Sequence, residues 1–527
     1  MASICTSNVT SGFIDLATFD ELEKYMYGGP DATAYFVRET RKSTWFTQVP
    51  VVLSRASGAP AFGVEWSVSI SRAGDYLMHT WLRCSFPEVR PALPRWTPAS
   101  PPIPPNNQPT PLGFWSAPAI RWTDNLMHNI VRECCITFND LVAARFDCYH
   151  LDFWAAFTVP AGKQNGYNVM IGNSPDVIDP VCVLNTQPAF GKPQLLPFTT
   201  LNLPLPLFFT RDSGVALPTA ALPYNDMRIN FNFRDISELL VVYDVAVNIT
   251  TPGGLPVSGS VWPPVDISAI PTTMTTVLAP RNFNLNTDTA INQTFNLTNC
   301  QVWANYAIVS NDERKRMACA PRDILIEQVQ TAPRQTLLAC SNKNPTFDIR
   351  FSHAIKVLFF GVRNITCQAE GSNYTTLTSN MTPKFIVPPI RVLAFDPLMS
   401  TSVVYENTQR LACMGSDYYS LVNPYYFAPN IPILTGYHMY SYSLDFYCLD
   451  PMGSTNYGKL TNVSMNPEAS MAAADGAGGG VTLTYGSDGA LLSPIVVWPV
   501  QKYEFVVTAV NNNIIRVSGG ALGFPVL

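Results

Sequence analysis

The sequence predicts an all-β protein built from sandwiches of short antiparallel strands. Three observations lead to this prediction: runs in which apolar and polar residues alternate, 45 prolines spread over 527 residues, and long irregular connections between the runs. Alternation with a period of two is typical of strands that bury one face. Proline interrupts helices but is tolerated at strand ends and in loops, so its frequency argues against long helices.

Alternating runs recur in both halves of the chain. They cover 62–70, 227–233 and 302–308 in the first half, and 347–351, 439–447 and 503–510 in the second. Residues 356–362 are mostly apolar without alternation, which predicts a strand buried on both faces. Many short strands with long connections predict sandwiches of the immunoglobulin or the jelly-roll type.

One segment predicts a helix. Between 12 and 27, apolar residues recur at spacings of three and four, at Leu16, Phe19, Leu22 and Met26. The following glycines and proline at 28–30 are a stop signal. We expect residues 1–33 to form an N-terminal arm with this short amphipathic helix. The helix packs either on its own domain, or on a neighbouring subunit or an underlying layer.

A boundary between two larger domains is predicted near 317–323. The densest cluster of charges, at 311–316, precedes Pro321 and a new apolar run at 324–326. The prediction is a first domain at 34–320 and a second at 321–527. Two long Pro-, Thr- and Asn-rich segments, at about 87–118 and 250–299, are predicted as surface loops of the first domain.

The composition favours a protein that packs against other proteins. Charged residues make up 13% of the chain, against roughly 25% in ordinary soluble domains, and the centres of protein interfaces are depleted in charge. A secreted or periplasmic β-protein is the alternative with a similar composition. The net charge of −5 and the lack of long basic runs argue against direct nucleic-acid binding.

Targeting signals are not evident in the sequence. The first ten residues lack the features of a signal peptide, and no run of 18 apolar residues predicts a transmembrane segment. We therefore expect the chain to be made and kept in a cytosol. Its 12 cysteines are predicted to be buried free thiols.

The motifs of catalysis are not found either, and we predict no catalytic, cofactor-binding or metal site and no enzymatic activity. None of the five histidines belongs to a metal or nucleophile motif. The triplet Asp212-Ser213-Gly214 resembles a fragment of a protease signature, but without an evident histidine partner it predicts a turn. Arg211 is expected to pair with a charge elsewhere in the fold.

The order of several segments resembles the major capsid proteins of iridoviruses and, more distantly, those of other large icosahedral DNA viruses, including viruses of chlorella algae. The resemblance covers nearly the whole chain and departs around 90–118 and 255–299, where surface loops are predicted. It rests on TSGFIDLAT (10–18), MYGG (26–29), WFT (45–47), PAFG (60–63), GDY (74–76), NLMHN (125–129), FTRDSG (209–214), LPYN (222–225), EQVQ (327–330), RFSHA (350–354), YENT (405–408), GSTNYG (453–458) and NIIR (513–516).

This resemblance implies a double jelly roll, with two eight-stranded antiparallel sandwiches in one chain. It implies a homotrimeric, pseudo-hexameric capsomer that tiles an icosahedral virion shell over an internal membrane and is assembled in the host cytoplasm. It further implies contacts with neighbouring capsomers and with minor capsid and membrane-anchoring proteins beneath the shell. Two alternatives remain: a lectin-like module whose outer loops recognise a host surface glycan, and a jelly-roll glycosidase, which needs two facing carboxylates.

Overall fold

The computed structural model describes residues 44–90, 95–98, 113–174, 177, 196–248, 275–277, 281–282, 284, 295–338, 345–376, 395–477, 481–482, 496–497 and 501–523. The chain divides into two units, Met1–Phe46 and Thr47–Leu527. All elements from β2 onward lie in the second unit. The predicted N-terminal arm at 1–33, with its helix at 12–27, lies outside the described residues.

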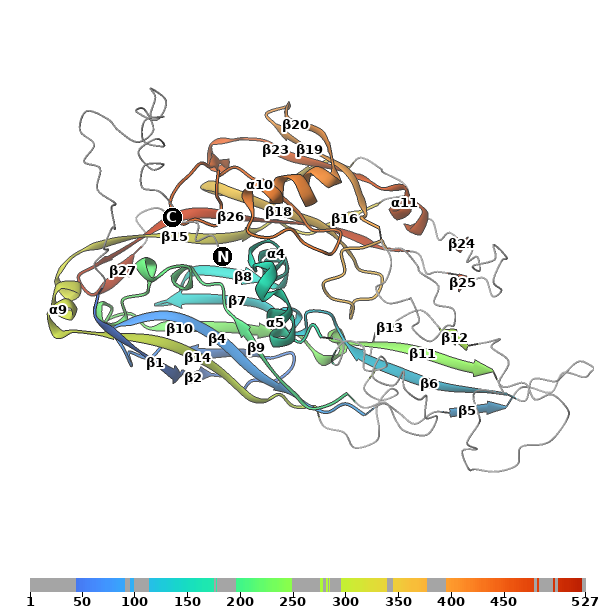
Figure 1. Ribbon diagram of the computed structural model, residues 1–527, viewed down its shortest axis with the longest axis horizontal. Coiled ribbons are helices and arrows are strands. Elements are labelled where there is room, and N and C mark those ends of the chain that lie inside the picture. The colour runs from blue at the N-terminus through green and yellow to red at the C-terminus, as the bar shows by residue number, and fades with distance from the viewer. Residues whose placement is uncertain are drawn as a thin grey trace, which may run out of the picture. The chain divides into compact units, whose positions relative to one another are not determined.

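The first group of strands forms two sheets around one apolar core (Figure 1). Leu82 and Val302 of one sheet belong to the same buried cluster as Ile136 and Ile229 of the other, so the two sheets form a sandwich. One sheet has the strand order β1 (Phe46–Val52), β14 (Thr298–Val309), β4 (Tyr76–Phe86), β9 (Thr199–Pro204). The other has the order β2 (Ser54–Ser57), β3 (Glu65–Ser69), β10 (Met227–Phe233), β7 (Val131–Phe138), β8 (Leu141–Asp147).

The alternating runs explain which side chains fill this core. In β10 the odd-numbered residues are buried and the even-numbered residues between them are half-buried, because successive side chains of a strand point to opposite faces. Phe231 stacks on Trp66 of β3, with ring centroids 5.5 Å apart. The strand predicted at 227–233 is confirmed. The one predicted at 62–70 is shorter, since β3 begins at Glu65 and Val64 is exposed.

A third sheet involves both segments predicted as long surface loops. Its order is β12 (Thr275–Val277), β11 (Leu240–Asn248), β6 (Gly113–Trp122), β5 (Arg95–Pro98), and β13 (Arg281–Asn282) also pairs with β11. At these positions the chain is extended and paired, where the sequence predicted irregular connections. Composition does not reveal a partner strand: β6 and β11 pair from Leu240↔Trp122 to Asn248↔Phe114 even though β6 contains Pro118.

The second group of strands forms another sandwich. Leu358 and Phe505 of one sheet share a buried cluster with Val403 and Met465 of the other. One sheet has the order β15 (Arg322–Thr331), β26 (Tyr503–Ser518), β18 (Ala354–Asn364), β21 (His438–Ser441), with β16 (Gln335–Leu337), β22 (Thr455–Asn456) and β27 (Ala521–Gly523) attached. The other has the order β17 (Phe347–Asp348), β23 (Val463–Ala469), β19 (Leu398–Tyr405), β20 (Thr408–Gly415), and β24 (Val481–Thr482) pairs with β25 (Val496–Val497).

Strand β18 is buried on both faces, as the run at 356–362 predicts. Leu358 and Phe360 face the core of the second sandwich. Phe359 points the other way and stacks on Phe153 and Phe157 of helix α4 (Cys148–Thr158), with centroids 6.2 and 5.5 Å apart. The sheet that contains β18 therefore lies between the second core and a helix that belongs to the first half of the chain (Figure 1).

The described helices are short, and α4 was not predicted. Its buried residues surround the whole helix, so it lacks the one-sided apolar pattern of a surface helix. Two local signals were available: Asp147 caps its N-terminus, accepting from the backbone N of His150 at 2.9 Å, and no proline occurs between Pro118 and Pro160. The other α-helices among the described residues are α3 (Leu126–Ile130), α5 (Ala161–Ile171), α9 (Asn311–Cys319), α10 (Asn423–Phe427) and α11 (Met471–Ala477).

The connection between the two groups of strands is helix α9. It follows β14, which ends at Val309, and precedes β15, which begins at Arg322. The described strands before and after α9 belong to different sheets. The domain limits at 320 and 321 remain a prediction.

Candidate functional site

The residues that the sequence analysis considered as possible catalytic groups have structural roles. The Asp212 carboxylate accepts a hydrogen bond from the backbone N of Gly214 at 3.2 Å, at the start of the 3-10 helix η3 (Ser213–Val215), so the predicted turn is confirmed. Among the described residues, no three His, Cys, Asp or Glu side chains lie close enough to hold a metal ion. No described helix is long and apolar enough to cross a membrane.

Sequence reasoning missed a cluster of a serine, a histidine and a carboxylate. Nε2 of His438, on β21, lies 2.9 Å from Oγ of Ser416 and 2.8 Å from Oδ2 of Asp396. In a catalytic triad the serine and the carboxylate bind opposite ring nitrogens: one nitrogen accepts the serine proton, and the carboxylate orients the ring through the other. Here both contact the same nitrogen, and the cluster does not have the geometry of a triad.

The Asp396 carboxylate instead anchors a loop. Burial raises its pKa, but His438 and Ser416 outweigh this effect and hold the pKa below its usual value. Its other oxygen accepts from the backbone N of Leu398 at 2.9 Å. The cluster thus joins the start of β19 to β21 within the second sandwich.

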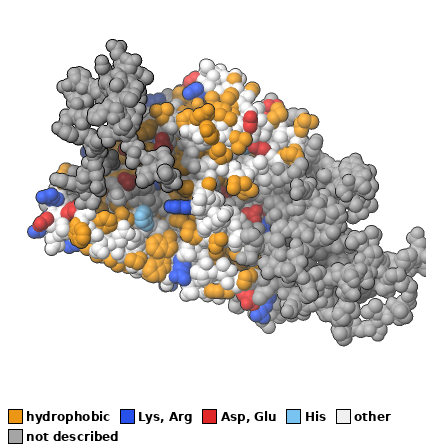
Figure 2. Space-filling view, in the orientation of Figure 1, with side chains coloured by type: hydrophobic (Ala, Val, Ile, Leu, Met, Phe, Trp, Pro, Cys, Tyr) orange, Lys and Arg blue, Asp and Glu red, His pale blue; other side chains and the backbone are white. Residues whose placement is uncertain are grey.

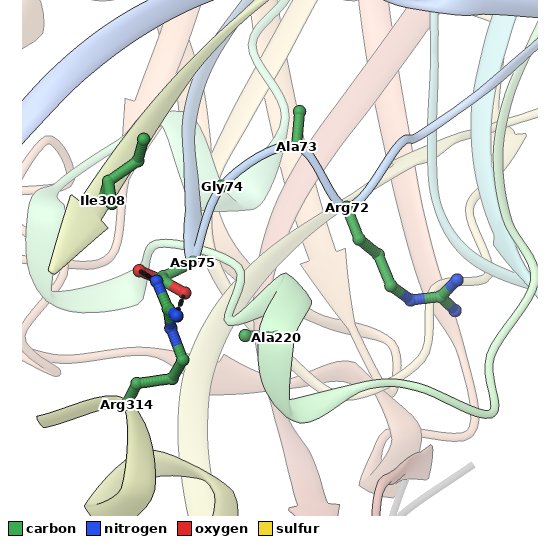
Figure 3. Close-up of a pocket in the computed structure, with 7 residues that line it drawn as sticks. All are labelled: Arg72, Ala73, Gly74, Asp75, Ala220, Ile308 and Arg314. Carbon is green, nitrogen blue, oxygen red and sulfur yellow. Dashed lines mark hydrogen bonds and ion pairs between the residues drawn. The ribbon is translucent and has the colours of Figure 1, made fainter. Parts of the chain in front are cut away.

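A pocket of about 360 Å³ lies beside the turn between β3 and β4 (Figure 3). Its two arginines are already engaged. Arg72 donates to the carbonyl oxygens of Leu222 and Asn225 at 2.9 and 2.6 Å, and Nε of Arg314 lies 2.6 Å from Oδ1 of Asp75. The ion pair between Arg314 and Asp75 ties α9 to the first sandwich.

The contact between the two sandwiches contains a buried triad of charges. Glu327, on β15, accepts from Nε of Arg211 at 2.8 Å and from Nζ of Lys356, on β18, at 2.7 Å. Further donors of the two cations reach the carbonyl oxygens of Tyr447 and Cys448, each at 2.7 Å. Arg211 lies in the first half of the chain and Glu327 in the second, so the triad joins the two sandwiches. The predicted pairing of Arg211 is confirmed.

A polar network on α4 makes a second connection. Asp152 accepts from Nδ1 of His128 at 2.8 Å, from Ser372 Oγ at 2.7 Å and from Tyr374 OH at 3.1 Å. His128 in turn contacts Tyr167 OH through Nε2 at 2.7 Å. The carboxylate is nearly inaccessible to solvent, and its hydrogen bonds offset the cost of burying it.

A third connection joins β6 to the loop after β18. Nη2 of Arg121 lies 3.2 Å from Oε1 of Glu370, and Nη1 lies 3.1 Å from Asp124. Burial raises the pKa of Glu370 to about 7, although Arg121 opposes the rise. The carboxyl group therefore changes charge near neutral pH.

His150 of α4 is buried in the same contact. It packs against Trp154 and Phe359, with ring centroids 5.5 and 6.5 Å away. Burial, followed by the charge of Arg211, lowers its pKa to about 3. The ring is thus neutral at physiological pH. Burial therefore shifts the pKa values of Glu370 and His150 in opposite directions, each toward the neutral form.

An uncharged segment of the second sandwich remains exposed. No charged residue occurs from Tyr418 to Leu434, which includes the π-helix η7 (Tyr418–Val422) and α10. Ile433 is 91% exposed and Tyr426 is 71% exposed, and hydrophobic side chains gather over the second sandwich in the upper part of Figure 2. Exposed apolar clusters commonly mark sites of protein contact. We name the exposed apolar residues of this segment the α10 surface: Leu421, Val422, Tyr425, Tyr426, Ile433 and Leu434.

Two family models match consecutive parts of the chain. Residues 34–307 match the major capsid protein N-terminus, and residues 313–523 match the large eukaryotic DNA virus major capsid protein. The major capsid protein of Costelytra zealandica iridescent virus is 56% identical over 527 residues, which is 100% of both chains. That of Tipula iridescent virus is 57% identical over 519 residues, which is 98% of both chains.

Solved structures show the same fold. The PBCV-1 virus capsid quasi-atomic model is similar with a TM-score of 0.63 and 16% identity, over 94% of this chain and 100% of that chain. The Faustovirus major capsid protein is similar with a TM-score of 0.60 and 10% identity, over 93% of both chains. The predicted double jelly roll is confirmed. The chain belongs to the family of major capsid proteins of large eukaryotic DNA viruses.

Proposed function

We propose that three copies of this capsid protein form a pseudo-hexameric capsomer, and that such capsomers tile an icosahedral shell around an internal membrane. The observation that carries the proposal is the α10 surface, which is apolar, uncharged and exposed in the single chain. Two similar sandwiches in each of three chains give a particle with six nearly equivalent sides, which suits packing among six neighbours.

A second copy of the chain is the occupant that best fits the α10 surface. Capsid proteins assemble with themselves, and stable interfaces between subunits often bury more than ~2,000 Å² and are apolar. Burying one large apolar side chain contributes about 1.5–3 kcal/mol, so the six side chains represent a substantial driving force. The low charge content of the whole chain supports the same conclusion.

The remaining expectations follow from this role. We expect contacts with minor capsid and membrane-anchoring proteins beneath the shell, assembly in the host cytoplasm, no direct contact with nucleic acid, and a structural rather than an enzymatic role. Recognition of a host surface glycan by outer loops remains the second candidate, and a glycan array probed with the purified oligomer tests it.

The oligomeric state of the full chain tests the main proposal. Size-exclusion chromatography with light scattering should give three times the chain mass of 58.0 kDa, and electron micrographs of the same fraction should show particles with a nearly hexagonal outline. A species of single-chain mass that persists at high protein concentration would contradict the proposal.

A further inference from the structure

We propose that Cys84 and Cys300 form a disulfide bond when the protein passes from the cytosol to an oxidising environment. Cys84 lies on β4 and Cys300 on the neighbouring strand β14, and their Sγ atoms are 2.7 Å apart. Both are free thiols in the structure. They are 216 residues apart in the sequence, so no local spacing indicates the pair.

An irregularity in the strand pairing brings the two sulfur atoms together. Thr298 pairs with Ser85 and Gln301 pairs with Arg83, so Asn299 and Cys300 both lie opposite Cys84. This is the arrangement of a β-bulge, and Asn299 adopts a positive φ of 48° there. Directly opposite residues in a regular pair have Cβ atoms about 4.5–5.5 Å apart, whereas a disulfide needs about 3.5–4.5 Å. The bulge turns Cys300 toward Cys84.

The two thiols differ in their access to an oxidant. Cys84 belongs to the core of the first sandwich and is fully buried. Burial, followed by the neighbouring Cys300, raises the pKa of the Cys84 thiol well above its usual value, so it remains protonated. Cys300 is only partly buried. An oxidant from solvent therefore reaches Cys300 first.

The oxidant is a low-molecular-weight disulfide such as oxidised glutathione, which accepts the two electrons. The Cys300 thiolate attacks one glutathione sulfur, which forms a mixed disulfide and releases one glutathione thiolate. Cys84 then attacks Sγ of Cys300 as its proton passes to the departing glutathione sulfur, which forms the Cys84–Cys300 bond and releases the second glutathione as a thiol. Two protein thiols are oxidised and one glutathione disulfide is reduced to two thiols. Cytosolic glutathione favours the reduced pair, and oxidising surroundings favour the bond.

Thiol mapping of the full chain tests the proposal. The chain is reduced with dithiothreitol, freed of reductant, incubated with oxidised glutathione, and unfolded in guanidinium chloride with N-ethylmaleimide. Mass spectrometry of the digest should find the peptides of Cys84 and Cys300 linked, and both alkylated when dithiothreitol is restored. The oxidised chain should also have a higher Tm than the reduced chain, because the bond restricts the unfolded state.

Variants separate the two steps. In Cys84→Ala, glutathione should remain attached to Cys300; in Cys300→Ser, a change at a partly buried position, the Cys84 peptide should be recovered alkylated. Cys135→Ser, a control at another partly buried cysteine of the first sandwich, should keep the link. The proposal is overturned if oxidised wild-type protein shows both cysteines alkylated, glutathione retained on Cys300, or Cys84 linked to a different cysteine.

Discussion

Two apolar surfaces of the second sandwich differ in whether charged residues lie beside them. The face of β18 that contacts α4 is covered within the chain, and the triad of Arg211, Glu327 and Lys356 is buried at the same contact. The α10 surface is exposed, and its segment contains no charged residue. A charge is tolerable in a buried contact only where a partner is held in place. The chain meets this condition in its internal contact. A surface that associates with another chain must first lose its water, which costs free energy where charged residues are present.

The largest effect on stability is expected from removing the carboxylate that the two buried cations share. Glu327→Gln should destabilise the protein by about 3–5 kcal/mol, because it leaves Arg211 and Lys356 buried without a counter-charge. The measurement is the midpoint of urea-induced unfolding. Asp323→Asn, on the same strand, is the matched control because its pair with Arg516 is exposed, and it should leave the midpoint unchanged. Equal effects of the two variants would show that the triad does not stabilise the contact.

A smaller effect is expected at Glu370 and depends on pH. Burial raises its pKa from 4.5 to about 7, so the folded chain keeps a proton that the unfolded chain releases. The resulting stability is present below pH 4.5 and is lost as the pH rises through 7. Between pH 5 and 8 the wild type should lose about 2.5 kcal/mol relative to Glu370→Gln. Urea unfolding at both pH values measures this difference, and Asp226→Asn controls for loss of a carboxylate from an exposed ion pair with Arg228.

His150 should change the stability with pH in the opposite direction. Its pKa falls from 6.5 to about 3 in the folded chain, so only the unfolded chain takes up a proton as the pH falls below 6.5. Stability is complete above this pH and is lost toward pH 3, by about 2 kcal/mol between pH 7 and 5. His150→Phe should flatten this slope, whereas His79→Phe, at an exposed position of β4, should retain it. Parallel profiles of wild type and His150→Phe would contradict the assignment.

The smallest effect on folding is expected on the α10 surface, where assembly should change instead. Ile433→Ser should shift the free energy of unfolding by less than about 0.5 kcal/mol, because an exposed side chain makes few contacts in the single chain. Light scattering should show a reduced fraction of trimer. Val169→Ser, at an exposed apolar residue of α5, is the control. Loss of the trimer in the control alone would place the interface elsewhere.

Much of the fold was predictable because strands follow local rules. The buried residues of β10 and the doubly buried run of β18 could be identified from the order of apolar and polar residues, since side chains of a strand alternate between two faces. Helix α4 could not be identified in this way, because it is buried on all sides and has no polar stripe. The strands in the predicted loops were missed because their Pro-, Thr- and Asn-rich composition is typical of loops, and because β6 finds its partner β11 more than a hundred residues further along the chain.

The sequence by itself determined that the chain is a charge-poor all-β protein, and its long collinear segments indicated a capsid protein. Only the tertiary structure decided which distant residues meet: Arg211 with Glu327, His438 with Asp396, and Cys84 with Cys300. The physical reason is that strand identity depends on neighbours two residues away. Contacts between residues 42 to 216 positions apart depend instead on how completed sheets and helices pack.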